Sequence, residues 1–562
     1  MPRTIQRFAV IAAATLVLPL VHAGTISVNS TADVADDDGA CTLREAIASA
    51  DSNAASGASA GECDAGEPSP TIDTIAFAIP GSGVHTIAPA SALPGITEAV
   101  VIDGYTQPGA TPNTLAIGDN AVLRIEINGS GVGISDNLFT LQGASAGSTV
   151  RGLVINGITQ TYFNLISGGN VIEGNFLGTD ASGMTYLGNG NLVSIVPGAG
   201  NRFGGTTPAS RNVIAATGHP AGGTLFVEAA GTVIQGNYIG VNAAGTGALQ
   251  DPIGTTAVDL EVSAPNTLIG GIDPGAGNVI LGTNTGIDIR THSAGVTIQG
   301  NLIGTDATGT VGLGGGFGIS GSFSAPNLTI GGSAPGAGNV ISGGLKGIEL
   351  FSVADGLVVQ GNKIGTDISG TRPVPNHGNG IHSFSSTPPR LIGGTGPGEG
   401  NTIAFNCSDG LDFFGGSWTV LGNSIYSNSG VGIHAPLPEF GGPATPSITS
   451  LSIVAGTATL SGVLDGATAS ANYRIEFFGN VVCDPSGRGE GRTFIGTTDV
   501  VTDADGHAAF GPLDFPVPDG EPVVTATATD PDGLTSAFSF CAGIADELFR
   551  SDFDRSVCGG GL

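Results

Sequence analysis

The side chains best suited to proton transfer lie in two neighbouring stretches of the chain, HGNGIHSFSSTPPR and CSDGLDFF. They contain His382, Arg390, Asp409 and Asp412, and histidine and aspartate are effective acid–base partners. If adjacent turns of the fold bring these side chains to one face, they would be the catalytic residues of a polysaccharide lyase or a glycoside hydrolase. The alternative is that GNGI and SDGL are ordinary corners of a repetitive backbone, and we favour that interpretation.

A second set of acidic residues recurs at one position of a repeated phrase. Asp180, Asp306 and Asp367 occupy it in three copies, and Asn242 occupies it in the fourth. Three coils between copies would space the carboxylates by roughly 14 Å, too far for one ion to bridge. The Gly-rich nonapeptide that binds Ca²⁺ is also absent. We expect these residues to cap turns. We predict no metal site and no cofactor; Ca²⁺ is the one ion that the acidic residues leave open.

Three further polar groups have a structural interpretation. Asp103, in VIDGYTQPGA, is typical of a turn, and Arg44 and Glu45 lie on the one convincing helix, where a cap and an ion pair are expected. TDADG from Thr502 and TDPDG from Thr529 lack the full Ca²⁺-binding loop and its final Glu, and indicate tight turns. No GxSxG, HExxH or GxxxxGK motif occurs in a suitable context. The chain therefore carries no specific catalytic signature.

Repeats indicate the fold that positions these residues. One phrase, as in GNLIGTDATGT and GNKIGTDISGT, places its asparagines at intervals of 62, 64 and 61 residues, and a second, as in GGIDPGAGNVI, interleaves with it at 66, 61 and 62. The asparagines are Asn175, Asn237, Asn301 and Asn362 in the first phrase, and Asn212, Asn278, Asn339 and Asn401 in the second. Each period contains short apolar runs interrupted by Gly. Such a unit cannot bury its own apolar face and must stack on its neighbours.

We therefore predict a right-handed parallel β-helix over residues 96–436. A period of about 62 residues divides into three coils of roughly 21, which gives ~16 coils and a rod about 75 Å long. The chief alternative is a β-propeller. It needs four antiparallel strands in each blade, and the short runs split by Gly fit that arrangement less well.

Both ends of the predicted β-helix have a different character. Residues 24–95 contain CTLREAIASAD, whose apolar residues follow helical spacing, and are expected to cap one end. Over residues 443–543, segments such as TATLSGVLDG and NYRIEFFGN alternate apolar and polar residues and predict an Ig-like β-sandwich. Residues 544–562 would form a short tail. The predicted fold class is all-β.

Composition and charge restrict location and partners. In residues 1–23, basic Arg3 and Arg7 precede a short apolar run and a small-residue cleavage site, as in a secretory signal peptide. No apolar run is long enough to span a membrane. Without the signal, 15 basic residues face 47 acidic ones, a net charge of −32, which argues against nucleic acid or an anionic membrane as partner. We expect an exported protein that is secreted or held at the cell surface.

The six cysteines indicate disulfides, because an even number in an exported chain favours pairing. Local spacing suggests two pairs, Cys41 with Cys63 and Cys483 with Cys541. The partners of Cys407 and Cys558 stay open. No two cysteines have the CxxC spacing of a metal site.

Several segments resemble one family. CTLREAI, which begins at Cys41, resembles the motif that names the CSLREA domain of exported bacterial proteins, with Thr42 in place of Ser. PGITEAVVIDGYTQPGA resembles the stretch that follows this motif, and the IGTD and PGAGNVI phrases resemble the β-helix repeats found downstream. YRIEFFGNVVCDPSGRGEGRTFIG is similar to the Ig-like module that often closes such chains. The resemblance implies an exported or surface protein of bacteria and implies no agreed reaction.

These observations favour a non-enzymatic β-helical protein that acts in adhesion or glycan binding, with a polysaccharide or a surface protein as its partner. The alternative is a polysaccharide lyase or glycoside hydrolase that acts along a groove of the β-helix. The sequence leaves open whether the protein catalyses any reaction. A deep groove where His, Arg and Asp converge would favour the enzyme.

Overall fold

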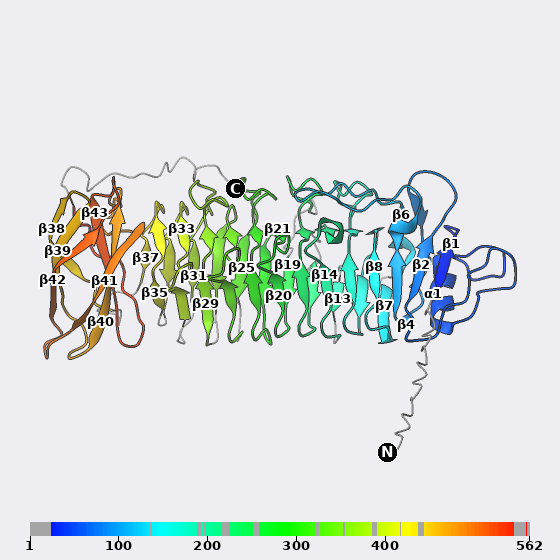
Figure 1. The fold of residues 1–562 in the computed structure, drawn as a ribbon, viewed down its shortest axis with the longest axis horizontal. Helices are drawn as coiled ribbons and strands as arrows, with labels where there is room; N and C mark the ends of the chain where they lie inside the picture. The colour runs from blue at the N-terminus through cyan, green and yellow to red at the C-terminus, as the bar shows by residue number, and fades with distance from the viewer. Residues whose placement is uncertain are drawn as a thin grey trace, which may run out of the picture.

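The chain forms a rod of stacked coils, covered at its N-terminal end by a helix and at its C-terminal end by a β-sandwich (Figure 1). This architecture is that of a computed structural model. The structure describes residues 24–133, 136–187, 193–195, 198–215, 224–250, 258–321, 325–351, 355–384, 390–415, 418–435, 443–543 and 558. The predicted signal peptide lies outside the described residues, as does the predicted tail apart from residue 558.

Each full coil adds one short strand to each of three parallel sheets, so the predicted parallel β-helix is confirmed. Sheet 1 consists of β1 (Thr25–Val28), β2 (Asp73–Phe77), β5 (Val100–Asp103), β8 (Thr149–Arg151), β11 (Val171–Glu173), β14 (Arg202–Gly204), β17 (Val233–Gln235), β20 (Leu268–Gly270), β23 (Thr297–Gln299), β26 (Thr329–Gly331), β29 (Leu357–Gln360), β32 (Arg390–Gly393) and β35 (Thr419–Leu421). Sheet 2 consists of β3 (His85–Ile87), β6 (Ile125–Asn128), β9 (Leu153–Asn156), β12 (Phe176–Leu177), β15 (Val213–Ile214), β18 (Tyr238–Ile239), β21 (Val279–Ile280), β24 (Leu302–Ile303), β27 (Val340–Ile341), β30 (Lys363–Ile364), β33 (Thr402–Ala404) and β36 (Ser424–Tyr426).

Sheet 3 carries the site described below. It consists of β4 (Ile96–Glu98), β7 (Asn137–Ala144), β10 (Thr161–Leu165), β13 (Val193–Ile195), β16 (Leu225–Val227), β19 (Val258–Val262), β22 (Thr285–Ile289), β25 (Phe317–Gly321), β28 (Lys346–Leu350), β31 (Ile381–Ser383), β34 (Leu411–Phe413) and β37 (Ile433–His434). Short 3-10 helices lie between strands of the rod: η1 (Gly104–Thr106), η2 (Gly129–Gly131) and η3 (Pro208–Ser210).

The interior of the rod is a stack of aliphatic side chains in register. In sheet 3, for example, Ile287, Ile319, Ile348 and Ile381 are neighbours on consecutive coils, and all four are fully buried. Successive side chains of a strand point to opposite faces, so the sequence Gly-Ile-Asp-Ile sends its isoleucines inward and its aspartate outward. Burial of one such aliphatic side chain contributes ~1.5–3 kcal/mol, which makes this stack the main source of stability.

The repeated asparagines form one hydrogen-bonded ladder at the corner between sheets 1 and 2. Asn301 donates both its backbone N–H and its Nδ2–H to Oδ1 of Asn339 on the next coil, and each donor nitrogen lies 3.0 Å from that oxygen. The same pattern links nine buried residues: Asn175, Asn212, Asn237, Asn278, Asn301, Asn339, Asn362, Asn401 and Asn423. The two interleaved phrases therefore alternate along a single ladder.

One sequence period is consequently two coils, and the prediction of three coils of about 21 residues is wrong. Strands β23 and β26, which are neighbours in sheet 1, begin 32 residues apart. The additional length lies partly in a hairpin loop that leaves every second coil, where Thr305 pairs with Gly312. Since sheet 1 has 13 strands in the described part of the chain, the rod is about 58 Å long at ~4.8 Å per coil.

The repeated aspartates cap these hairpin loops, as predicted. Oδ1 of Asp306 accepts hydrogen bonds from the backbone N–H groups of Thr310 and Val311. Asp367 and Asn242 accept equivalent bonds in their own loops. The loops stack on one another through backbone hydrogen bonds and pack on the outer face of sheet 2. The loops therefore cover part of the outer face of sheet 2.

Helix α1 (Leu43–Ser52) covers the N-terminal end of the core. Thr42 accepts a hydrogen bond from the Glu45 N–H and donates its own N–H to the Glu45 carboxylate, which confirms the predicted capping box. Arg44 pairs with Asp33 at 2.9 Å. Strands β1, β2 and β3 precede residue 96 and already belong to sheets 1 and 2, so the boundary expected near residue 95 does not coincide with the end of these sheets.

A β-sandwich closes the C-terminal end of the rod. Its first sheet consists of β38 (Ser447–Val454), β39 (Thr457–Leu464) and β42 (Ala508–Pro516), and its second of β41 (Thr493–Val501), β40 (Asn472–Asn480) and β43 (Val523–Thr529). All pairs of strands are antiparallel, and the two sheets share one apolar core, as predicted for this region. Phe478 and Phe538 belong instead to the core of the rod, so the two units share an apolar interface.

The sandwich also ends a second, shorter asparagine ladder. Asn376, Asn406 and Asn428 continue from coil to coil, and Asn428 then donates its N–H and Nδ2–H to Glu490 of the sandwich at 3.0 and 3.1 Å. The Ser427 N–H donates to the second oxygen of Glu490 at 2.6 Å. Burial raises the pKa of Glu490 to about 8, against the opposing effect of these hydrogen bonds. A carboxyl group thus takes the place of the next asparagine.

Three disulfides complete the fold. Cys41–Cys63 and Cys483–Cys541 form as the spacing predicts, and Cys407, on the rod, pairs with Cys558, a partner that the sequence left open. Within the described ranges, no helix has the length and apolarity needed to cross a bilayer.

Candidate functional site

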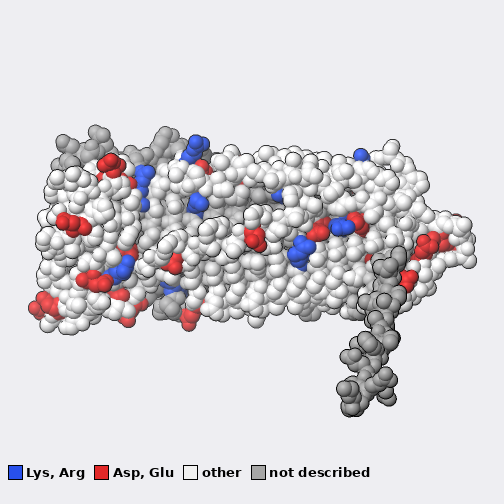
Figure 2. All heavy atoms as spheres, viewed as in Figure 1, with Lys and Arg blue, Asp and Glu red and all other residues white. Residues whose placement is uncertain are grey.

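The outer face of sheet 3 carries a row of polar side chains in register. From β19 onward its strands carry an inward Ile or Leu followed by an outward residue, and from β22 onward a Gly comes before the inward residue. The outward residues, which we call the outer row, are Glu261, Asp288, Ser320, Glu349, His382, Asp412 and His434. Charged side chains are otherwise sparse: most of the surface visible in Figure 2 is uncharged. The outer row is therefore a concentration of ionisable groups.

In the first part of the outer row, acids are neutralised by permanent cations. Arg290 lies 3.2 Å from Glu261 and 2.7 Å from Asp288. Burial raises the pKa of Glu261, and Arg290 opposes this effect. Further along, Lys346 lies 2.9 Å from Glu349, which is almost fully buried. Arg290 explains how the adjacent coils of Glu261 and Asp288 carry two carboxylates side by side.

His382 is enclosed between two acids of the outer row. Its Nδ1 lies 3.0 Å from both carboxylate oxygens of Glu349 and 2.9 Å from Nζ of Lys346, and its Nε2 lies 3.4 Å from Asp412. The Phe384 ring packs against the imidazole in a T-shaped arrangement, with 4.3 Å between centroids. Because both nitrogens face protein groups and the side chain is buried, His382 is better placed to join the two acids than to reach a ligand.

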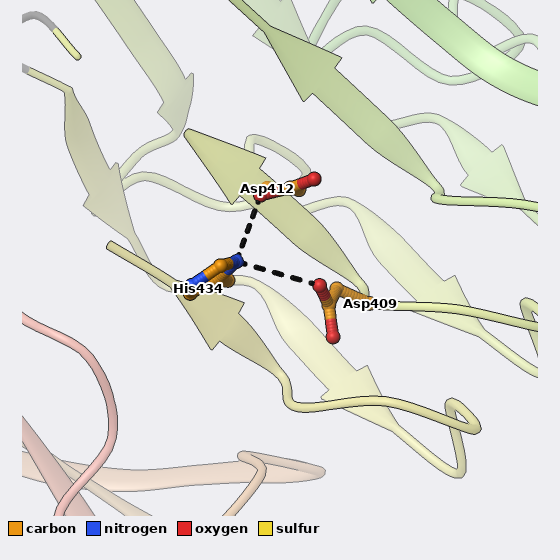
Figure 3. Close-up of side chains that lie close together, drawn as sticks. All are labelled: Asp409, Asp412 and His434. Carbon is orange, nitrogen blue, oxygen red and sulfur yellow. Dashed lines mark hydrogen bonds and ion pairs between the residues drawn. The ribbon is translucent and has the colours of Figure 1, made fainter. Parts of the chain in front are cut away.

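The end of the outer row brings together Asp409, Asp412 and His434 (Figure 3). Nδ1 of His434 lies 2.9 Å from Oδ1 of Asp412 and 3.6 Å from Oδ2 of Asp409. Asp412 is buried, whereas the His434 side chain is 57% exposed. Burial raises the pKa of Asp409, and the adjacent Asp412 carboxylate raises it further, while the Val431 N–H and His434 act in the opposite direction. Asp412 and His434, together with the neighbouring Asp409, form the most accessible ionisable cluster along the outer row.

A ridge of phenyl rings runs beside the outer row. Phe351, Phe384 and Phe414 each lie two residues beyond an outer-row position, and they are 41%, 47% and 64% exposed. Their centroids are 5.8 and 5.3 Å apart, and the rings lie nearly parallel. The Phe414 ring also lies 6.4 Å from that of His434. We call these three residues the aromatic ridge, and with the outer row they make an amphipathic strip.

One candidate from the sequence does not join the site. Arg390 lies in β32 of sheet 1 and is almost fully buried, with its guanidinium 4.8 Å from the ring centre of Trp418. It lies two residues before the inward Ile392, so strand alternation directs it to the interior as well. The prediction that Arg390 would converge with His382, Asp409 and Asp412 is therefore wrong, whereas the other three do converge.

Sequence reasoning missed Glu349, His434, Lys346 and the aromatic ridge. A signal for most of them was present, because GIELF, GIHSF, GLDFF and GIHAP share one register. The third letter of each gives the outer row, and the fifth letter of the first three gives the aromatic ridge. Aligning the strands on their glycines would have found both columns.

Comparison with known proteins adds no functional assignment. No protein-family model matches the chain, and no curated protein matches it. The site must therefore be interpreted from its own chemistry.

His434 is the one imidazole of the outer row that faces solvent. When neutral, it donates Nδ1–H to Asp412, which leaves Nε2 as an acceptor on the outside. An aspartate that orients a histidine in this way is a recurrent arrangement in acid–base catalysis. The cluster can therefore accept hydrogen bonds, exchange a proton or ligate a cation.

Proposed function

We propose that the protein is an exported β-helical rod that binds a hydroxyl-rich polysaccharide on the outer face of sheet 3 and does not cleave it. The binding surface is the amphipathic strip formed by the aromatic ridge and the end of the outer row. In the extracellular space or at the cell surface, such a rod would act in adhesion or in retention of a glycan matrix.

The aromatic ridge is the observation that carries this proposal. Three large apolar side chains on consecutive coils remain 41–64% exposed, although the rod buries its other stacked rings, such as Phe139 and Phe163. Exposed apolar surface of this kind marks interaction sites. A sugar ring has an apolar C–H face that packs on aromatic groups, and hydroxyls that donate charge-assisted hydrogen bonds to carboxylates. The strip offers both kinds of contact side by side.

Charge favours a neutral polymer over an acidic one. The net charge of −32 of the chain without its signal, 15 basic against 47 acidic residues, repels polyanions at long range. At the site itself, the partly exposed Asp409 carboxylate offers an acceptor for hydroxyl groups, and the exposed imidazole of His434 offers a further polar contact. We therefore expect neutral polysaccharides to bind more tightly than uronate-rich ones in the absence of divalent cations.

The test is affinity electrophoresis of the mature chain against neutral and acidic polysaccharides. Replacing Phe351, Phe384 and Phe414 together by Ala should weaken binding by ~10-fold or more, equivalent to about 1.4 kcal/mol. Phe540→Ala is the matched control, because Phe540 is as exposed as Phe414 but lies near the sandwich. Equal binding by the triple variant and the parent protein would contradict the proposal. Capture of a surface protein and no glycan would replace the polysaccharide as partner.

A second candidate function is cleavage of the same polymer by a lyase or hydrolase mechanism. The Asp412–His434 pair favours it, because its outward Nε2 is suitable as a base. The deciding measurement is the appearance of new chain ends in incubated polysaccharide. Cleavage that disappears in His434→Ala, with binding retained, would establish an enzyme. Absence of new ends with tight retention of the polymer would support a binding protein.

Export and family membership belong to the same proposal. The signal-like residues 1–23 support secretion, and three disulfides fit an oxidising compartment outside the cytosol. CTLREAI supports membership of the CSLREA group through its residues alone. Mass spectrometry of the secreted protein should find the chain starting at Gly24 if the signal is cleaved as the sequence predicts.

A further inference from the structure

The cluster at the end of the outer row has the composition and spacing of a metal-binding site. Asp409 and Asp412 come from one coil and His434 from the next, and one ligand atom from each lies within 4.8 Å of the others. Figure 3 shows the two carboxylates and the imidazole pointing toward a common region. Two carboxylates with one imidazole form a ligand set that suits transition metals.

We propose that Asp409, Asp412 and His434 bind a divalent transition-metal ion, with Zn²⁺ the best fit. Zinc accepts three protein ligands with an open fourth position, at ~2.0–2.2 Å from nitrogen and oxygen. Ligand atoms of a tetrahedral site are then about 3.3 Å apart. The distances from His434 Nδ1 to the two carboxylates, 2.9 and 3.6 Å, lie on either side of that value. The ligand atoms of Asp409 and Asp412 lie within 4.8 Å of each other, so we expect these two side chains to adjust on binding.

The surroundings hold each carboxylate ready for an ion. Asp412 is almost fully buried and uses Oδ2 to accept a hydrogen bond from Asn379 at 2.8 Å, while Oδ1 faces His434. Asp409 uses Oδ1 to accept the Val431 N–H at 2.8 Å, and Oδ2 faces His434. One oxygen of each group is thus fixed by the protein and the other is directed at the shared region. Ligating carboxylates are oriented by outer hydrogen bonds in this manner.

The distribution of ion pairs along the outer row also favours a cation at Asp409 and Asp412. Glu261, Asp288 and Glu349 are each paired with an arginine or a lysine. In the part of the chain that the structure describes, the ion-pair partners of Asp409 and Asp412 are histidines alone. A dication would balance the two carboxylates there. It would displace the proton from Nδ1 of His434 and leave Nε2–H directed outward.

The bound ion would keep a coordination position toward solvent. His434 is largely exposed, and its ring lies 6.4 Å from Phe414 at the end of the aromatic ridge. A hydroxyl or carboxylate oxygen of a polymer seated on the ridge would be the natural additional ligand. That last step rests on the proposed function, whereas metal binding itself does not.

The test measures Zn²⁺ binding to the purified mature chain by competition with a chromophoric chelator, without any polysaccharide. We expect one tight site, and a loss of affinity of ~100-fold or more in His434→Ala and in Asp409→Ala. Asn379→Ala, which removes an orienting hydrogen bond, should weaken binding by ~10–100-fold. His507→Ala is the matched control, since His507 pairs with a single aspartate, Asp465, on the sandwich. It should bind zinc like the parent protein.

Two further measurements keep the inference testable if a variant misfolds. His434→Gln preserves size and polarity, and far-ultraviolet circular dichroism checks that each variant is folded. Co²⁺ bound in place of Zn²⁺ should show the intense visible absorption of a tetrahedral site, which should be absent from His434→Gln. Undiminished Zn²⁺ affinity in folded His434→Gln, or binding of Ca²⁺ in preference to Zn²⁺, would overturn the assignment. Neither result bears on polysaccharide retention measured without metal.

Discussion

At the scale of the residue, stacking decides which side chains a position can carry. Equivalent positions lie ~4.8 Å apart on successive coils, so neutral groups such as asparagine and phenylalanine stack on copies of themselves. Ionisable groups cannot do so at low cost, because like charges at that distance repel. The outer row avoids this conflict in two ways: its last part alternates acids with histidines, as Glu349, His382, Asp412 and His434, and the neighbouring acids Glu261 and Asp288 share Arg290.

The hairpin-loop aspartates give a prediction at this scale. Asp367 accepts backbone hydrogen bonds from Thr371 and Arg372, and the chain itself carries Asn242 at the equivalent position, where Oδ1 makes the same kind of bond. We expect Asp367→Asn to change the unfolding free energy by less than ~0.5 kcal/mol and Asp367→Ala to lower it by ~1–2 kcal/mol.

Chemical denaturation of the two Asp367 variants and the parent protein checks this expectation. A cost for Asp367→Asn as large as that for Asp367→Ala would mean that the negative charge, and not the acceptor oxygen, is what the loop requires. That outcome would reopen the interpretation of these aspartates as cation ligands.

At the scale of the element, the long asparagine ladder supplies hydrogen bonds to polar groups that are buried at the corner between sheets 1 and 2. Asn339, for example, accepts two hydrogen bonds from Asn301, and its Nδ2–H groups donate to Ile298 O at 2.8 Å and to Oδ1 of Asn362 at 2.9 Å. Its side chain is completely buried. Each rung therefore satisfies groups on the coils to either side of it.

We expect Asn339→Ala to lower the unfolding free energy by at least ~3 kcal/mol. The change leaves several buried donors and acceptors without hydrogen-bond partners, and each of them costs ~1–3 kcal/mol when unpaired. Asn284→Ala is the control, because Asn284 is an exposed asparagine of the same rod, and its effect should stay within ~0.5 kcal/mol. Thermal unfolding followed by circular dichroism measures both. Equal melting curves for the two variants would contradict a stabilising role for the ladder.

The fold was largely predictable because its elements repeat. Short apolar runs, Gly corners and two interleaved phrases require a stacked solenoid, and the Thr42–Glu45 capping box identified the helix. The number of coils was not predictable from the period alone. Each period holds two ladder asparagines, and that observation would have implied two coils, but the hairpin loop after IGTD lengthens one coil and conceals the count.

The site was predictable only in part, for a geometrical reason. His382 and Asp412 each lie two residues after a glycine that precedes a strand of sheet 3, and the two strands are neighbours, so the two side chains meet. Arg390, eight residues after His382, belongs to the next side of the coil and faces inward. Sequence distance does not reveal when the chain turns a corner, whereas strand register does.

At the scale of the whole molecule, the joint between rod and sandwich should depend on pH. Burial raises the pKa of Glu490 from its ordinary value of 4.5 to about 8. Protonated Glu490 therefore favours the folded state, and this contribution is complete below about pH 4.5 and is lost as the pH rises through about 8. The contribution is at most ~4–5 kcal/mol, since one pKa unit corresponds to 1.36 kcal/mol.

Glu490→Gln should remove this part of the pH dependence, because glutamine does not titrate. We expect the melting temperature of the parent protein to fall relative to that of the variant as the pH is raised from about 5 to about 8. Differential scanning calorimetry across that range makes the comparison. Parallel profiles for the two proteins would show that the carboxyl group is accommodated equally well in both protonation states.

The Cys407–Cys558 bond has a mechanical consequence. It joins a corner of the rod to a residue beyond the sandwich and closes a loop of chain that contains the whole sandwich, the two cysteines having a sequence separation of 151. Tension applied to the chain beyond Cys558 would pass through the sulfur bridge directly into the rod. The sandwich would then bear no load, and it would keep its fold under forces that reach the stacked coils.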